Sequence, residues 1–95
     1  MKVVWSPEAR QDLREIYLYL AAENPDAARA LHKRIKQGVQ LLRANPHIGR
    51  PGRVPGTREL VISGTSYIVP YQVREKCLEL LRVYHTARKW PEYFH

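Results

Sequence analysis

The side chains best suited to chemistry are cations and aromatic rings that gather in the second half of the chain. Guanidinium groups bind the oxygens of phosphates and carboxylates, aromatic rings stack on bases, and a histidine can transfer a proton. These candidate site residues are Arg50, Arg53, Arg58, Tyr67, Tyr71, Arg82, Tyr84, His85, Arg88, Lys89 and Trp90. Such a set would suffice for metal-independent cleavage of RNA through its 2′-hydroxyl. It would equally suffice for holding an acidic protein surface without any reaction.

Other kinds of site have little support in the sequence. The histidines show no ligand spacing and Cys77 is the single cysteine, so we expect no metal site and no internal disulfide. The glycine-rich loop His47–Gly56 lacks the Lys-Ser/Thr ending of a P-loop, and we expect no cofactor. Glu59 lies among basic residues, which favours a role as a cross-strand ion-pair partner over one as a catalytic acid.

The charge of the chain is unevenly distributed. Sixteen Lys and Arg against nine Asp and Glu give a formal net charge of +7, and no carboxylate occurs from Ala27 to Arg58. A local excess of one sign favours an anionic partner such as RNA, DNA or an acidic protein segment. The alternative is a solvated basic surface that keeps the protein soluble.

The length of 95 residues suits one core, so we expect a single domain spanning residues 1–95. The sequence shows neither a cationic-then-apolar leader nor a long apolar run. We therefore expect a cytoplasmic protein with no membrane partner.

Two helices are predicted in the first half, after a short apolar strand at Lys2–Trp5. Ser6-Pro7-Glu8 has the N-cap, proline and acidic first turn of a helix start, and Asn24-Pro25-Asp26 repeats this pattern. The first helix has apolar residues at helical spacing, and its polar residues are expected on the opposite side, namely Arg10, Gln11, Asp12, Arg14 and Glu15. The second helix ends at Asn45-Pro46, and the short link predicts a helix hairpin. Gly38 is expected where the two helices approach closely.

Three strands with short turns are predicted in the second half, at Thr57–Ile62, Tyr67–Val73 and Leu78–His85. Pro70 lies inside the middle strand and has no N–H to donate, which predicts a bulge or a locally unpaired position. The predicted fold class is α+β: an N-terminal strand and an antiparallel helix hairpin packed on an antiparallel β-sheet that a three-stranded C-terminal meander completes. The hairpin would cover one face of the sheet and leave the other partly open.

The last strand is expected to position the candidate site. Within Cys77–Pro91, Leu78 and Leu80 are expected on one face, and Leu81 and Val83 on the other. This pattern favours a strand that is covered on both sides. A buried strand that ends in cations and rings would hold them as one patch on a rigid base.

The order of these segments resembles the RelE/ParE superfamily of bacterial toxin–antitoxin toxins over nearly the whole chain. The segments that carry the resemblance are Ser6–Ala9, Asn45–Pro51, Gly56–Val61, Tyr67–Val73 and Leu80–Pro91. The resemblance implies a helix hairpin on an antiparallel sheet. It also implies a growth-inhibiting toxin that a cognate antitoxin neutralises in a hetero-oligomer. We expect the antitoxin on the open apolar sheet face and on the carboxylate-free segment.

The superfamily divides by target. RelE-like members cut mRNA on the ribosome, whereas ParE-like members poison DNA gyrase. The nuclease branch places an arginine in the middle strand where this chain has Ile68, and the lysine-rich segment of RelE is replaced by Arg50 and Arg53. Loss of a cation at the centre of a site weakens a nuclease, so the resemblance favours a non-catalytic gyrase inhibitor.

Two alternatives remain open. One is a ribosome-dependent mRNA endoribonuclease that uses Arg58, Arg82, His85 and Arg88, with Tyr84 stacking on a base. The other is a toxin fold without toxicity that serves only as a partner for its antitoxin.

Overall fold

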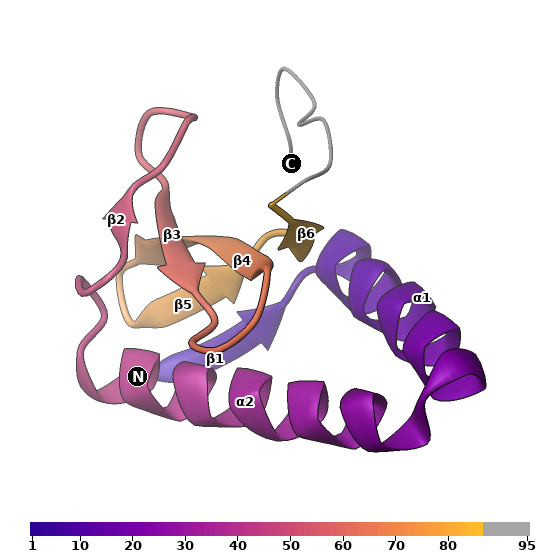
Figure 1. The fold of residues 1–95 in the computed structure, drawn as a ribbon. Coiled ribbons are helices and arrows are strands. Elements are labelled where there is room, and N and C mark those ends of the chain that lie inside the picture. The colour runs from indigo at the N-terminus through magenta and orange to yellow at the C-terminus, as the bar shows by residue number, and fades with distance from the viewer. Residues whose placement is uncertain (87–95) are drawn as a thin grey trace.

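A computed structural model describes residues 1–86 of the chain as a layer of two helices on a six-stranded sheet (Figure 1). The elements in chain order are β1 (Lys2–Trp5), α1 (Pro7–Glu23), α2 (Pro25–Ala44), β2 (Arg50–Pro51), β3 (Arg58–Val61), β4 (Tyr67–Arg74), β5 (Cys77–Leu80) and β6 (Tyr84–His85). The predicted α+β class and the predicted N-terminal strand are confirmed.

Asn24 alone connects the two helices and caps both of them. Its backbone N–H donates to the carbonyl of Leu20 at the end of α1, and its side-chain oxygen accepts from the N–H groups of Asp26 and Ala27 at the start of α2. Ser6 caps α1 by accepting from the N–H of Ala9 at 2.9 Å. These caps satisfy donors that a helix start leaves unpaired, and they confirm the predicted helix hairpin. Within residues 1–86, neither helix has the length and apolar character needed to span a bilayer.

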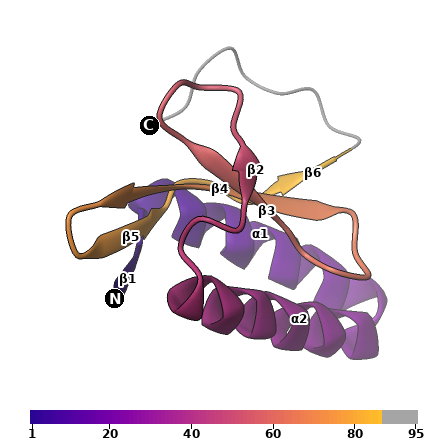
Figure 2. The same ribbon diagram turned by 90° about the vertical axis from the view of Figure 1, so that its left-hand side faces the viewer.

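The sheet has the order β1-β5-β4-β3-β2, and β6 also pairs with β4. Both helices lie on one face, while residues 1–86 place no helix on the other face (Figure 2). Most neighbouring strands are antiparallel as expected, but β1 runs parallel to β5, so the sheet is mixed. The chain between these two strands contains both helices, and such a long connection permits parallel pairing.

The predicted continuous strand Leu78–His85 is interrupted. Three residues, Leu81–Val83, lie between β5 and β6, opposite only Val69 and Pro70 of β4, which makes a bulge. The N–H of Leu81 donates to the carbonyl of Pro70 at 2.8 Å. Because the N and O atoms of a strand residue point to the same side, the missing N–H of Pro70 faces this bulge. The bulge predicted from Pro70 is confirmed.

The bulge changes which side chains face the helices. Leu78 and Leu80 lie in the main core beneath the helices as expected, but Val83 joins them there instead of sharing the opposite face with Leu81. One inserted residue shifts the alternation of a strand by one position. On the face without helices, a smaller buried cluster consists of Ile68, Leu81 and Tyr84, with Val54 packed against it.

Gly38 does not mark a close approach of the two helices. A Cβ atom at this position would lie 3.3 Å from side-chain methyl groups of Leu60 and Ile62. The absence of a side chain at Gly38 therefore allows these two residues to pack closely against α2. The prediction of a close approach was right about the need for space and wrong about the neighbour.

Tyr71 belongs to the core, although the sequence suggested a binding role. Its side chain is fully buried. Its hydroxyl donates to the carbonyl of Pro46 at 2.8 Å and accepts from the N–H of Gly49 at 2.9 Å, which ties the loop after α2 to the sheet. Burial is the main cause that raises the pKa of Tyr71 above its ordinary value of 10.0.

This environment predicts a loss of stability at alkaline pH. A phenol whose pKa is raised on folding stabilises the protein fully below its unfolded pKa, and that contribution is lost as the pH rises through the folded value. We expect Tyr71→Phe to lower the free energy of unfolding by about 1–3 kcal/mol at neutral pH, because the buried N–H of Gly49 and the partly buried carbonyl of Pro46 lose their hydrogen bonds. Urea unfolding between pH 7 and 11 measures both effects. Burial also raises the pKa of Tyr84, so the variant should lose only part of the alkaline sensitivity. An unchanged pH profile would contradict this role of Tyr71.

Candidate functional site

The structure divides the predicted cationic and aromatic set instead of gathering it into one patch. Arg50, Arg53 and Arg58 lie on or between β2 and β3. The second group lies at β4, β6 and the bulge, namely Tyr67, Arg82, Tyr84 and His85. Tyr71 is in the core, and Arg88, Lys89 and Trp90 lie outside the described residues.

Arg82 forms an ion pair with Asp12 of α1. Its Nε and Nη2 atoms donate to the two carboxylate oxygens at 2.7 and 3.0 Å, and Oδ2 also accepts from the N–H of Val83 at 3.0 Å. The side chains of Arg82 and Asp12 are only 27% and 13% exposed. Hydrogen bonding to Asp12 is the main cause that raises the pKa of Arg82. Asp12 was expected on the outer, polar side of α1, but it faces the bulge and neutralises a predicted site residue.

Rings surround this ion pair. The Arg82 guanidinium lies over the Tyr84 ring at 4.9 Å from its centroid. Tyr67 and His85 are partners across β4 and β6, with ring centroids 5.1 Å apart and planes at 89°. Together with Asp12 and Tyr19 of α1, these residues border a groove of about 720 Å³, which we call the β6 groove. The structure therefore brings together Tyr67, Arg82, Tyr84 and His85 of the predicted set.

The arginines of the other group also have internal partners. Arg50 pairs with Glu59 across β2 and β3 at 2.9 Å, which confirms the predicted role of Glu59 as a cross-strand ion-pair partner. Arg58 donates through Nη1 to the carbonyls of His47 at 3.1 Å and of Gly49 at 2.9 Å. These contacts hold the loop between α2 and β2 against the sheet.

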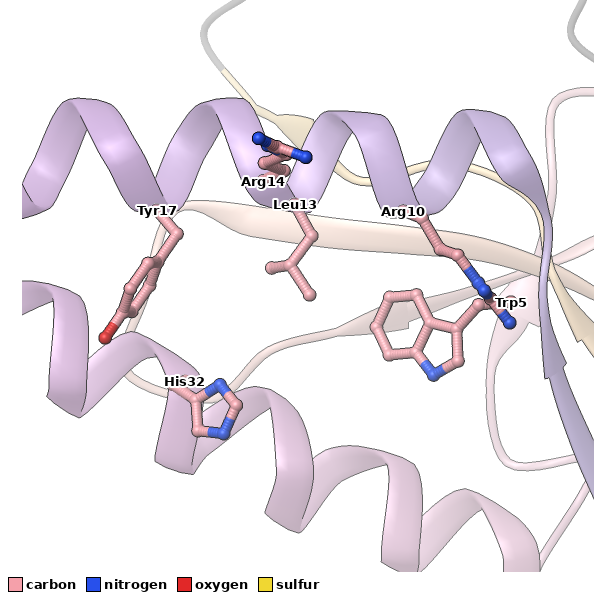
Figure 3. A pocket seen from close by; sticks show the side chains of 6 residues that line it. All are labelled: Trp5, Arg10, Leu13, Arg14, Tyr17 and His32. Atoms are coloured by element: carbon pink, nitrogen blue, oxygen red, sulfur yellow. The ribbon is translucent and has the colours of Figure 1, made fainter.

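A second groove lies on the opposite flank of α1, where α1, α2 and β1 meet. One part of about 600 Å³ is drawn in Figure 3, and its lining residues are Trp5, Arg10, Leu13, Arg14, Tyr17 and His32. An adjoining part of about 360 Å³ shares Trp5, Leu13 and His32, and is lined further by Val3, Ile35, Lys36, Val39, Gln40 and Arg43. We call the two parts the helix groove. Its walls combine apolar side chains with cations, and none of its lining residues is acidic.

The helix groove is not among the sites predicted from the sequence. A signal was present, because Arg10, Leu13, Arg14 and Tyr17 recur at helical spacing on one side of α1. Tyr17 is 38% exposed, and its ring meets that of His32 edge-on at 6.3 Å. Trp5, which also lines the groove, belongs to β1. The groove therefore exists only because the helices pack on β1, and the helical spacing alone does not predict it.

Metal coordination has no visible basis in the part of the chain that the structure describes. Within residues 1–86, no three His, Cys, Asp or Glu side chains gather closely enough to hold a metal ion.

Comparison with known proteins gives matches over nearly the whole chain. Residues 3–90 match the model of the family described as "ParE toxin of type II toxin-antitoxin system, parDE". The putative toxin Y4kP of Sinorhizobium fredii is 38% identical over 96% of this chain and 94% of its own length. Toxin RelE2 of Caulobacter vibrioides is 32% identical over 92% of this chain and 97% of its own length. Among solved structures, a chain of the chromosomal ParDE toxin–antitoxin system from P. aeruginosa has a TM-score of 0.77 at 31% identity. That match covers 87% of this chain and 92% of the other.

The ion pair at the bulge predicts a stability effect of Asp12→Asn. An amide cannot accept from both guanidinium nitrogens and from the Val83 N–H, and it leaves Arg82 half-buried without its counter-charge. We expect a loss of about 1–3 kcal/mol in the free energy of unfolding, less than for a fully buried pair because Arg82 is partly exposed. Urea unfolding measures the loss, and Glu15→Gln is the matched control on an exposed carboxylate of the same helix. Equal stability of the two variants would show that the ion pair does not fasten the bulge.

Proposed function

Because the chain belongs to the ParE toxin family of type II toxin–antitoxin systems, we propose that it arrests growth by binding DNA gyrase and catalyses no reaction. Its antitoxin partner neutralises it by forming a hetero-oligomer. Both proposed partners act in the cytoplasm, where we propose that the chain works.

The main observation that supports a non-catalytic toxin is the Asp12–Arg82 ion pair. A nuclease needs cations that are free to stabilise the charge that develops on phosphate. Arg82 already has its bidentate acceptor in Asp12. A phosphate would have to compete with a carboxylate that the fold itself supplies.

The face of the sheet that lacks helices supports the same proposal. Ile68, Leu81 and Tyr84 form a buried apolar cluster on this face, and Val61 beside it is 50% exposed. Ile68 and Val61 are cross-strand partners, so they share this face. An exposed apolar side chain on this face suits contact with a protein better than contact with an RNA backbone.

The runner-up is a ribosome-dependent mRNA endoribonuclease. It is favoured by the β6 groove, where the Tyr67 and His85 rings lie near Arg82 and Tyr84, and by the 32% identity to a protein named Toxin RelE2. In this alternative His85 would transfer the proton and Tyr84 would stack on a base.

We further propose that the antitoxin docks in the helix groove. The groove offers Trp5, Leu13 and Tyr17 as apolar contacts, with Arg10 and Arg14 beside them. An amphipathic segment that carries apolar anchors and carboxylates matches both properties. This placement differs from the sheet face expected from the sequence, because the helix groove has apolar walls that open to solvent.

A supercoiling assay with purified gyrase tests the proposed target. We expect the chain to inhibit supercoiling or to trap a DNA cleavage complex, and we expect an excess of antitoxin to restore the activity. In parallel, mRNA 5′ ends are mapped after the chain is induced in cells. Normal supercoiling together with codon-phased mRNA cuts would replace the gyrase proposal with the endoribonuclease. Absence of both effects would leave only the role as an antitoxin partner.

Antitoxin docking in the helix groove predicts different effects for two neighbouring residues. We expect Tyr17→Ala to weaken antitoxin binding roughly 10- to 100-fold, as truncation of an aromatic anchor does at interface centres. Leu18→Ala is the matched control, because Leu18 follows on the same helix, is 59% exposed and lines neither groove. Titration calorimetry measures both affinities. Equal losses for the two variants would place the antitoxin elsewhere.

A further inference from the structure

Arg58 presents a hydrogen-bonding edge that the fold leaves open. Its Nη1 group uses both hydrogens on the carbonyls of His47 and Gly49, which fixes the guanidinium in place. The opposite edge consists of Nε–H and the two hydrogens of Nη2. Within residues 1–86 this edge makes no hydrogen bond and no ion pair. A guanidinium that is held rigid by one edge binds an anion with the other at little further cost in side-chain entropy.

Arg82 of the same molecule shows which ligand this edge accepts. Its Nε and Nη2 atoms hold the carboxylate of Asp12 in a bidentate arrangement at 2.7 and 3.0 Å. The chain thus contains two anchored arginines, one with its carboxylate supplied internally and one without.

The surroundings of Arg58 suit a carboxylate from outside the chain. Arg58 lines a hollow of about 350 Å³, and the other lining residues are His47, Pro51, Gly56, Thr57 and Val73. None of them is acidic, and no carboxylate precedes Arg58 in the sequence back to Asp26. The next residue, Glu59, points to the opposite face of the sheet, where it pairs with Arg50.

The hollow lies on the same face of the sheet as the helix groove. Val73 of β4 pairs with Leu78 of β5, which pairs with Val3 of β1, so the three side chains form one row across the strands. Val3 lines the helix groove and Val73 lines the hollow at Arg58. Two strand spacings separate them, about 10 Å. Leu78 between them is fully buried in the main core, so the row relates the two sites within the fold but is not a path over the surface.

From this geometry we propose that the hollow at Arg58 and His47 binds a carboxylate side chain of the antitoxin, from the segment that follows or precedes the part seated in the helix groove. Arg58 takes the carboxylate in a bidentate pair, His47 adds a second polar contact, and Val73 and Pro51 pack against the aliphatic part of the acidic side chain. The proposal rests on antitoxin docking in the helix groove and is independent of the toxin's target.

A pair of variants at Val73 tests the site without disturbing the anchorage of Arg58. Val73→Glu places a carboxylate of the chain's own into the hollow, where it competes for Arg58. Val73→Gln has the same size and polarity without the charge. We expect the antitoxin to bind the Glu variant at least roughly tenfold more weakly than the Gln variant by titration calorimetry, since charged hydrogen-bonded pairs contribute this much at interfaces. Equal affinities for the two variants, both folded by thermal unfolding, would overturn the proposal.

A scan of the antitoxin identifies the partner group. Each Asp or Glu is changed to Asn or Gln and titrated against the wild-type chain and against Arg58→Lys, which keeps the charge but lacks the bidentate edge. We expect one carboxylate whose loss weakens binding to the wild type by roughly tenfold and to the Lys variant by less than about twofold. Additive losses at every position would exclude a specific partner for Arg58. Lys33→Gln, an exposed cation of α2 that lines no groove, is the control for a general charge effect.

The outcomes separate this proposal from the proposed function. If Tyr17→Ala weakens binding while the Val73 variants bind alike, docking in the helix groove stands and the carboxylate site fails. If Tyr17→Ala has no effect, the docking proposal fails, and the Val73 pair still reports on Arg58. Neither measurement involves gyrase.

Discussion

The missing N–H of Pro70 is the constraint from which the arrangement around the candidate site follows. A strand beside Pro70 cannot form all of its backbone hydrogen bonds there, and the bulge Leu81–Val83 lies at this position. The bulge exposes backbone groups that need partners, and the first part of α1 supplies them. Ser6 donates its hydroxyl to the carbonyl of Leu81 at 2.8 Å, and Asp12 accepts from the N–H of Val83. One proline in β4 thus determines where α1 is fastened.

Within residues 1–86, the same contacts of α1 explain why the charge of Arg82 at the bulge is neutralised. Arg82 extends from the bulge and meets Asp12 only because α1 is fixed there. Its guanidinium then lies over the Tyr84 ring at 4.9 Å, so the aromatic side chain is held as well. A net charge of +7 therefore overstates how many cations are free at this end. Within residues 1–86, cations also line the helix groove and the hollow at Arg58.

Local rules predicted the features whose cause lies within a few residues. The helix starts at Ser6 and Asn24 follow from capping, and the bulge follows from the chemistry of proline. Features that join distant segments were not predictable in this way. Asp12 and Arg82 are 70 residues apart, and a polar residue on a helix gives no sign of which neighbour it meets. Val83 was placed on the wrong face because a bulge shifts the alternation by one residue. The described members of the expected patch are divided because Arg58 lies on β3 and holds the loop after α2, whereas Arg82 lies at the bulge and pairs with Asp12.

The two grooves constrain how an antitoxin can silence this toxin. Tyr17 lines the helix groove and Tyr19 lines the β6 groove, so α1 stands between them as a ridge. An antitoxin segment confined to the helix groove would not contact the β6 groove or the sheet face that lacks helices. Neutralisation therefore requires either that the rest of the antitoxin excludes the target by its bulk, or that its chain continues around the molecule. The hollow at Arg58 lies on the same side of the sheet as the helix groove, two strands away from Val3. An antitoxin carboxylate bound to Arg58 would orient the antitoxin segment that leaves the helix groove. Arg58 would then determine the direction in which the antitoxin continues around the toxin, as well as the affinity of the complex.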